Sequence, residues 1–351
     1  MAQKNKKSCK YTSIGGQALI EGIMMRGPKR TVMATRMPDG SIDLEELEFR
    51  PLREKHKFLG WPLIRGVVGM VESMKVGYRA LMRSAEKAGV EIEEEPGPVE
   101  KKLNKLFGDK LFSILMGVAM VLGVGLAMLL FLYLPVLVFN LLNHFIPADI
   151  IAWKGLIEGV LKILIFLAYV ALTSLMPDIK RVYQYHGAEH KTIFCYEAGE
   201  ELTVDHVRSK RRFHPRCGTS FLILMLVVSI LISTLVLYLF PALTKITWLW
   251  VLIKLLLIPI VCGIGYELIK WCGRSDNIVT RIIAAPGLWM QRLTTKEPDD
   301  SMMEVAIAAL KEVLPENEKA LSRNDSSEAA PVSSTEETPV ASEAEQEPNT
   351  L

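Results

Sequence analysis

The sequence lacks the short motifs that mark several common enzyme classes. It has no Ser-centred G-x-S-x-G elbow, no P-loop and no G-x-G-x-x-G dinucleotide turn. No basic patch with interleaved aromatic residues stands out, so we expect no nucleic-acid partner. The five cysteines are an odd number without a close framework of pairs, which argues against a disulfide scaffold.

Charge is scarce in long blocks, and this scarcity indicates the fold class. Residues 112–142 contain no charged side chain, and the segments 155–176, 220–240 and 247–271 contain few. A helix crosses the hydrocarbon core of a bilayer with about 20 apolar residues. We therefore predict a mostly α-helical, polytopic membrane protein with about four transmembrane helices, the first within 111–142 and bent near Pro135.

The few charged residues inside the predicted spans are candidates for function. Glu158 and Lys162 are four residues apart, so they can pair on one face of a helix. A charge inside a membrane is costly and is a functional candidate by default. The alternative is that both lie near the helix end and extend to the interface. A transport path would depend on these two residues together with Lys254 and Glu267.

The distribution of basic residues predicts the orientation. The loop 177–219 holds eight Lys and Arg residues, whereas the loops 143–154 and 241–246 hold one Lys each. The positive-inside rule therefore places loop 177–219 and both termini in the cytoplasm. The start of the chain has basic residues without an apolar segment behind them, so we expect no secretory signal peptide.

The segments outside the spans differ in character. Residues 1–110 predict a small cytoplasmic α+β region with a β-hairpin around Pro38-Asp39-Gly40. Within it, apolar residues at helical spacing over 61–86 predict a membrane-surface helix or a helix of a soluble core. Residues 272–314 form a cytoplasmic C-terminal region in which 300–314 is typical of an amphipathic helix. The composition of residues 315–351 predicts a disordered acidic tail.

The stretch Y-H-G-A-E-H-K, residues 185–191, is the best candidate for chemistry. His186 and His190 would share one face of a helix, at the separation that two imidazoles need to hold a metal. Glu189 would point the same way, and H-x-x-E-H is the inverted zincin pattern, in which the glutamate activates metal-bound water. Gly187 lowers the helix propensity of the motif. The alternative is a polar segment that caps the helix bundle.

Further ligands follow in the same loop. His214 and Cys217, in F-H-P-R-C-G-T, are three residues apart beside a glycine, which favours a metal half-site. Zinc suits imidazole and thiolate ligands better than magnesium or calcium does. A structural site would use four protein ligands, and a catalytic site would leave one position open. Residues that could join the same site are Glu21, Glu267 and Cys195.

A second dense stretch is G-G-Q-A-L-I-E-G-I-M-M-R-G-P, residues 15–28. Its glycines would let the backbone approach a partner or ligand closely. One interpretation is a strand or helix that packs within the N-terminal region. The other is a second element that contacts the ligand of the His/Cys site.

Taken together, these motifs resemble the YqhQ-type bacterial membrane proteins. The resemblance rests on the two stretches above, on L-I-R-G-V-V, on H-P-R-C-G-T-S-F and on A-P-G-L-W-M-Q-R-L-T-T-K-E-P-D-D, and runs from about Gly15 to Leu314. It implies an integral protein of the plasma membrane. The family has no established reaction, and its members are often described as predicted metal-dependent enzymes.

The sequence thus supports two classes of function. The first is a zinc-dependent membrane enzyme with hydrolysis as its reaction class. In it, the zinc ligands would be His186, His190, His214 and Cys217, and Glu189 would be the catalytic base. The second is a non-enzymatic scaffold, assembly factor or transport component in which the His/Cys loop is structural. The expected partner is the lipid bilayer, and a homo-oligomer or another membrane protein is left open.

Overall fold

The described part of the chain begins with a four-stranded antiparallel meander. In this computed structural model the strands β1 (Gly15–Leu19), β2 (Gly22–Arg26), β3 (Thr31–Arg36) and β4 (Ile42–Glu46) pair in sequence order. The structure describes residues 14–49, 51–52, 56–89, 111–146, 150–214, 217–272 and 277–314. The predicted disordered tail, 315–351, and Cys9 lie outside these residues.

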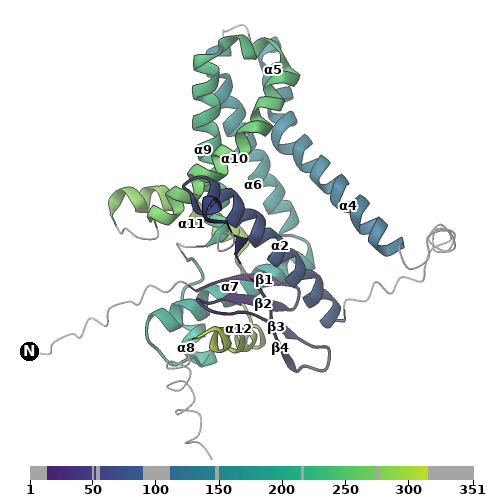
Figure 1. Cartoon of the computed structure of the whole chain (residues 1–351), viewed down its shortest axis with the longest axis vertical. Coiled ribbons are helices and arrows are strands. Elements are labelled where there is room, and N and C mark those ends of the chain that lie inside the picture. Colours follow the sequence, from purple (N-terminus) through teal and green to yellow (C-terminus); the bar gives the residue numbers. More distant parts are fainter. Residues whose placement is uncertain are drawn as a thin grey trace, which may run out of the picture. The chain divides into compact units, whose positions relative to one another are not determined.

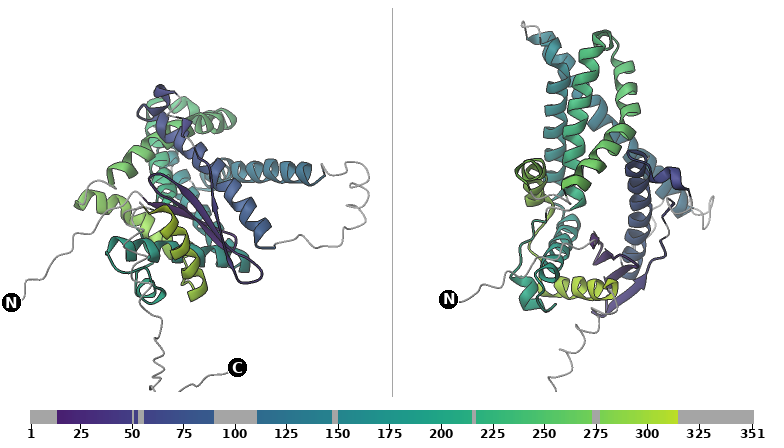
Figure 2. Two further views of the ribbon diagram at one scale, coloured as in Figure 1. Left: turned by 60° about the horizontal axis from the view of Figure 1, so that its bottom comes forward. Right: turned by 60° about the vertical axis from the view of Figure 1, so that its left-hand side comes forward.

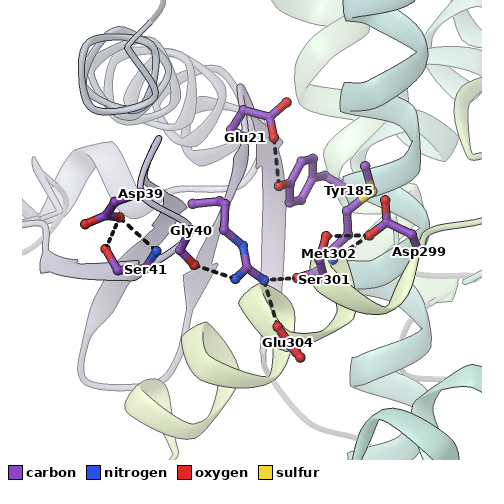
Figure 3. Close-up of polar contacts among 10 residues, drawn as sticks. Glu21, Asp39, Gly40, Ser41, Tyr185, Asp299, Ser301, Met302 and Glu304 are labelled. Atoms are coloured by element: carbon purple, nitrogen blue, oxygen red, sulfur yellow. Dashed lines mark hydrogen bonds and ion pairs between the residues drawn. The ribbon is translucent and has the colours of Figure 1, made fainter.

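The β3–β4 hairpin forms at the predicted turn. Gly40 has a φ of +85°, a conformation that glycine adopts without steric cost. The Asp39 carboxylate accepts hydrogen bonds from the backbone N–H and the hydroxyl of Ser41, at 2.9 and 2.6 Å (Figure 3). These local bonds explain why the short P-D-G signal was sufficient to predict the turn.

Helices cover both faces of the sheet. One face packs on α7 (Pro177–Glu197) and α12 (Asp300–Val313), through Ile23 and Met25 among others, and α8 (Val204–Arg208) packs on these two helices. The other face packs on α2 (Ile64–Lys87), through Leu19 and Met24. Neighbouring residues of β2 therefore face opposite cores, which explains its unbroken apolar run. The helices predicted over 61–86 and 300–314 are confirmed.

In the described part of the chain, four helical segments are long and apolar enough to cross a membrane. They cover Gly117–Phe145, Ile151–Thr173, Gly218–Leu239 and Thr247–Cys272. The first consists of α4 (Leu111–Met128), a π-helical turn η3 (Leu129–Tyr133) and α5 (Leu134–Phe145). The others are η4 (Ile151–Trp153) with α6 (Lys154–Thr173), α9 (Gly218–Leu239) and α10 (Thr247–Cys272), with η5 (Pro241–Lys245) between the last two. The predicted fold class is confirmed.

The bend of the first span comes from more than its proline. Pro135 occupies the first turn of α5, where its missing N–H is tolerated. The π-helical turn immediately precedes it and ends with Tyr133. Together they mark the change of direction between α4 and α5 seen in Figure 1.

Two further helices complete the described chain. α11 (Ile278–Thr294) lies against α9, and η1 (Lys57–Gly60) precedes α2. The segment 177–219, expected as a loop, is mostly helical because α7 fills its first half. Figure 2 shows α6, α9 and α10 side by side, with α4 pointing away from them and with the sheet and α12 beyond one end of this group.

The charged residues inside the spans pair across helices. Glu158 of α6 accepts a hydrogen bond from the Trp250 indole at 2.9 Å and forms an ion pair with Lys254, both on α10. Lys162 donates to the Ser229 hydroxyl of α9 at 3.1 Å. Glu158 and Lys162 are only 2% and 7% exposed, so the expectation that they extend from a helix end was wrong. Glu158 and Lys162 therefore contact residues of neighbouring helices, and the predicted contact between these two residues within α6 is replaced by contacts across helices.

Candidate metal centre

Helix α7 carries the H-x-x-E-H motif. It starts well, because Pro177 stands in its first turn and Asp178 places a negative charge at its N-terminal end. The low helix propensity of Gly187 is offset by packing. A Cβ at this position would overlap the carbonyl oxygen of Lys296, so only glycine lets α7 approach the segment after α11 this closely.

The two histidines of the motif are held in the same tautomer. Nδ1 of His186 lies 2.8 Å from the carbonyl oxygen of Thr294, and Nδ1 of His190 lies 2.5 Å from that of Arg212. A carbonyl can only accept, so Nδ1 carries the proton in both rings. The lone pair of each Nε2 is then directed elsewhere, as in metal-ligating histidines whose other nitrogen donates to a backbone carbonyl.

Cys217 supplies a third ligand atom. It is the N-cap residue of α9, and its Sγ lies 3.1 Å from Nε2 of His186 and 3.1 Å from the Thr219 hydroxyl. One ligand atom each from His186, His190 and Cys217 lie within 4.8 Å of one another, and all three residues are buried. Sequence residues 31 apart are thus joined where α7 meets the start of α9.

Glu189 lies beside this group in a cradle made by β1. Its carboxylate accepts a hydrogen bond from the backbone N–H of Gly16. A Cβ at Gly16 would lie 2.9 Å from the Glu189 Cδ, so glycine is required for this approach. The second carboxylate oxygen, Oε2, is buried with no hydrogen-bond partner among the described residues.

Burial controls the protonation of the site. It raises the pKa of Glu189 to about 7, although the neighbouring His186 opposes this shift. Burial also lowers the pKa of His190, so its neutral form is favoured. For Cys217, burial works to raise the pKa, but interactions with the His190 imidazole and with Thr219 bring it below its usual value. Metals bind neutral imidazole and thiolate, and a lowered pKa of His190 and of Cys217 favours these forms.

His214, the fourth predicted ligand, lies next to the three-residue group. Its ring centroid is 5.7 Å from that of His190, and its Nε2 is 3.6 Å from Oε2 of Glu197. The Gln291 side chain holds its backbone through two hydrogen bonds of 2.7 Å, one to the N–H and one to the carbonyl. His214 is therefore placed near the site, but it is outside the group whose ligand atoms converge.

The comparisons with known proteins agree with the motifs. A family profile described as "Protein of unknown function (DUF1385)" matches residues 61–316. The chain belongs to this family. It is also 35% identical over 301 residues to the "Uncharacterized protein YqhQ" of Bacillus subtilis (strain 168), which covers 86% of this chain and 92% of the relative. No solved structure matches. The resemblance to YqhQ-type proteins is thereby confirmed.

The part of the chain that matches the DUF1385 family contains every member of the metal-ligand group. His186, His190 and Cys217 all lie within 61–316. Gly16, which cradles Glu189, precedes the matched region. The YqhQ relationship covers more of the chain than the family profile does. The region that matches the family therefore contains these three residues, and the strand that carries Gly16 precedes it.

The three additional candidates have other partners. Glu21 binds Arg181 and accepts a hydrogen bond from the Tyr185 hydroxyl at 3.1 Å (Figure 3). Glu267 pairs with Arg65 at 2.7 Å. Cys195 is buried, and its thiol lies 3.3 Å from the carbonyl oxygen of Glu201. None of them belongs to the converging group in the described part of the chain.

A cavity of about 940 Å³ opens in front of the site. Its wall includes Glu189, His190, His214 and Cys217 on one side. Other parts of the wall come from the ends of the strands nearest Gly15 and Arg26, from α2 and from Tyr266 of α10. The cavity therefore lies where the sheet, α2 and the ends of the spans meet, and a molecule inside it can reach Glu189.

Sequence reasoning missed the residues that orient the ligands. The carbonyl groups of Thr294 and Arg212 and the side chain of Gln291 were not singled out. Backbone carbonyls leave no trace in a motif, whereas Gln291 stands within A-P-G-L-W-M-Q-R-L-T-T and carried a usable signal. The alternative in which the glycine-rich stretch contacts the site is supported by Gly16.

Proposed function

We propose that the protein is an integral membrane protein of the bacterial plasma membrane that binds zinc through His186, His190 and Cys217 and acts as a metal-dependent hydrolase. The observation that carries this proposal is the convergence of three buried ligand atoms. Two are imidazole Nε2 atoms whose Nδ1 partners are satisfied by carbonyl groups. This pattern of orientation is characteristic of ligating histidines.

Unsatisfied polar atoms support a cation at this position. Nε2 of His190 and Oε2 of Glu189 are both buried without a hydrogen-bond partner among the described residues. Leaving a buried polar atom unpaired costs about 1–3 kcal/mol, so each such atom calls for a partner. The donor set of two imidazoles and one thiol is suited to zinc rather than to magnesium or calcium.

The proposed chemistry assigns each residue a role. A bound zinc ion would supply a Lewis acid that lowers the pKa of a water molecule. The Glu189 carboxylate accepts one hydrogen bond, from the Gly16 N–H, and its Oε2 has no hydrogen-bond partner among the described residues. Glu189 would take up a proton from the water molecule through Oε2. His186 and His190 would stay neutral, because their Nδ1 protons are committed to carbonyl groups. Such a division of roles fits hydrolysis.

Whether His214 is a fourth protein ligand distinguishes a structural zinc site from a catalytic one. Three converging protein ligands leave one coordination position open, which is the arrangement of catalytic zinc. A structural site would need a fourth protein ligand, and His214 is the nearest imidazole, with its centroid 5.7 Å from that of His190. With a structural zinc site of this kind, the protein would be a non-enzymatic membrane scaffold or transport component, which is the second candidate function.

We place the metal centre on the cytoplasmic side. The segment 177–219 contains it and holds eight Lys and Arg residues, which favours the cytoplasm under the positive-inside rule. Both termini would share that side. The reducing conditions there keep Cys217 available as a thiolate ligand.

Metal analysis tests the proposal. The full chain is purified in detergent as wild type and as His186→Ala, His190→Ala, Cys217→Ser and Glu189→Gln, with Glu21→Gln as a carboxylate control outside the group. We expect one zinc ion per chain in the wild type, Glu189→Gln and the control, and a large loss in the other three variants. A wild type without metal would contradict the proposal.

Complementation of a deletion strain separates the two functions. For an enzyme, Glu189→Gln binds zinc but does not restore the wild-type phenotype. Full complementation by Glu189→Gln would favour the structural site and the scaffold function.

A further inference from the structure

Helix α2 lies against a predicted span. A Cβ added at Gly66 would be 2.7 Å from the Cβ of Tyr266, and one added at Gly263 would be 2.8 Å from the carbonyl oxygen of Leu63. Contacts this close require glycine on both helices. The start of α2 is therefore fixed to α10 near the end of α10 that faces the sheet (Figure 1).

The contact places the start of α2 beside the part of α10 that precedes Glu267. Arg65 donates to Glu267 at 2.7 Å, and this partly exposed pair marks the polar level of α10. Gly263 is one turn further into the span, which is about 6 Å at 1.5 Å per residue. Amphipathic helices at a bilayer surface bury their apolar face by about 5–10 Å. Leu63, which touches Gly263, lies at that depth.

The outward face of α2 is uncovered and mostly apolar, with Lys75 as an exposed charged residue on it. Ile64, Val71, Met74 and Tyr78 recur at helical spacing, and Met74 is 67% exposed. Before the helix, Phe58 and Trp61 are also exposed, the latter by 63%. Trp at such a level is typical of the interface between lipid and water. Because this face belongs to a helix that packs on α10, a candidate membrane span, the leaflet is the occupant that it fits.

The opposite face of α2 lines the cavity of the metal centre. Gly69, Glu72, Ser73 and Val76 belong to its wall. At 100° per residue these positions point away from Val71 and Met74 by about half a turn. One helix thus separates the outward face from the cavity, and a Cβ at Gly69 would meet no atom within 4 Å, so a side chain at that position would extend into the open space of the cavity.

We infer that the cavity takes the polar head of an amphiphile that enters sideways from the leaflet in which α2 is embedded. This inference names the substrate class of the proposed hydrolase and rests on that proposed function. The acyl chains stay against the apolar face of α2 and the spans, while the head group passes Gly69 and reaches Glu189. A water-soluble substrate would reach the cavity without contacting the exposed apolar face of α2.

Photocrosslinking tests the inference on the full chain in nanodiscs of phosphatidylethanolamine and phosphatidylglycerol. p-Benzoylphenylalanine is placed at Val71, which faces outward, at Ser73, which faces the cavity, and at Glu86, at the far end of α2, as the control. After irradiation, mass spectrometry detects phospholipid adducts. We expect adducts at positions 71 and 73 and none at 86.

Two glycine variants supply the matched control. Gly69→Leu fills the cavity wall, whereas Gly60→Leu adds the same side chain where it also meets no atom within 4 Å. The adduct at position 73 should fall at least fivefold in Gly69→Leu and stay unchanged in Gly60→Leu, with position 71 unaffected in both. Both should keep the wild-type zinc content.

The outcomes distinguish failure of the lipid route from failure of the proposed zinc-dependent function. No adduct at position 71 would overturn the embedding of α2, and adducts at 71 without any at 73 would overturn entry of the amphiphile. An adduct at 73 that Gly69→Leu does not reduce would contradict the proposed route. A wild type that forms these adducts but contains no zinc would contradict the proposed function and leave the lipid route standing.

Discussion

The protein contains two buried polar clusters that differ in how their members are satisfied. Inside the spans, Glu158 is met by Lys254 and Trp250, so its charge and one of its oxygens have partners from the protein itself. At the end of the spans, the Nε2 atoms of His186 and His190 converge with Cys217. The first cluster joins helices and pairs its charge within the protein, and its one buried atom without a hydrogen-bond partner among the described residues is Oε1 of Glu158. In the second cluster, Nε2 of His190 and Oε2 of the adjacent Glu189 have no such partner.

This difference separates a structural role from a binding role. Both clusters are buried, and burial alone would make each a functional candidate. The groups that contact each cluster distinguish the two roles. Carbonyl groups of Thr294 and Arg212 orient the imidazoles, whereas the Glu158 cluster holds opposite charges in direct contact.

The largest expected effect breaks the cluster inside the spans. Glu158→Ala leaves Lys254 buried without its counter-charge, which should lower the free energy of unfolding by about 3–5 kcal/mol. Thermal unfolding in detergent measures this loss, and the zinc content should stay at the wild-type value. The double variant Glu158→Leu, Lys254→Met should recover most of the stability. Loss of zinc in a folded Glu158→Ala protein would show that the clusters are coupled.

The next largest effect compares two glycines in helices. Gly187→Ala forces α7 away from the Lys296 carbonyl, which disturbs the neighbouring bond between His186 and Thr294. We expect about 1–3 kcal/mol of destabilisation and a 10–100-fold loss of zinc affinity.

Gly159→Ala is its control inside the spans, where the new methyl group meets the Ile230 side chain. It should cost a similar amount of stability with no change in zinc affinity. Equal zinc affinities in the two alanine variants, measured by competition with a chelator, would contradict a special role for the α7 contact.

A smaller effect comes from the clamp on the His214 backbone. Gln291→Leu removes two hydrogen bonds and leaves buried backbone groups of His214 unpaired, which should cost about 1–3 kcal/mol. Zinc affinity should change less than tenfold, because His214 lies outside the converging ligands. A loss as large as that of His190→Ala would instead make His214 a ligand, and the structural site would then be favoured.

The smallest effect concerns Glu21, one of the residues that the sequence allowed as a ligand. Glu21→Gln weakens a partly exposed pair with Arg181, so stability should change by about 1 kcal/mol or less. Zinc content and complementation should be unchanged. Loss of zinc in this variant would extend the metal centre to the β1–β2 turn.

Local patterns explain what the sequence could predict. The four apolar segments, the P-D-G hairpin and the helical spacing of His186 and His190 each depend on neighbours within a few residues. Such patterns need no knowledge of packing. Even the Gly187 doubt was a local argument, and it was outweighed by a contact with Lys296, 109 residues further along the chain.

Contacts between distant segments explain what it could not predict. The sheet is covered by α7 and α12, which follow it by more than 100 residues, and Gly16 meets Glu189 across a similar separation. Glu158 took a partner from α10 because α6 and α10 approach each other, which no i, i+4 rule can foresee. The chemistry of the side chains indicated His186, His190, His214 and Cys217 as candidate ligands, and three of them converge. The orientation of the two histidines of the motif depends on carbonyl groups that any residue could provide.

X-ray absorption at the zinc edge tests the central claim most directly. For the purified full chain, we predict one sulfur at about 2.3 Å and two imidazole nitrogens at about 2.0–2.1 Å, with one further light ligand that is not imidazole. Cys217→Ser should remove the sulfur shell. A wild-type spectrum without sulfur, or one with three imidazoles, would contradict an open zinc site built from His186, His190 and Cys217.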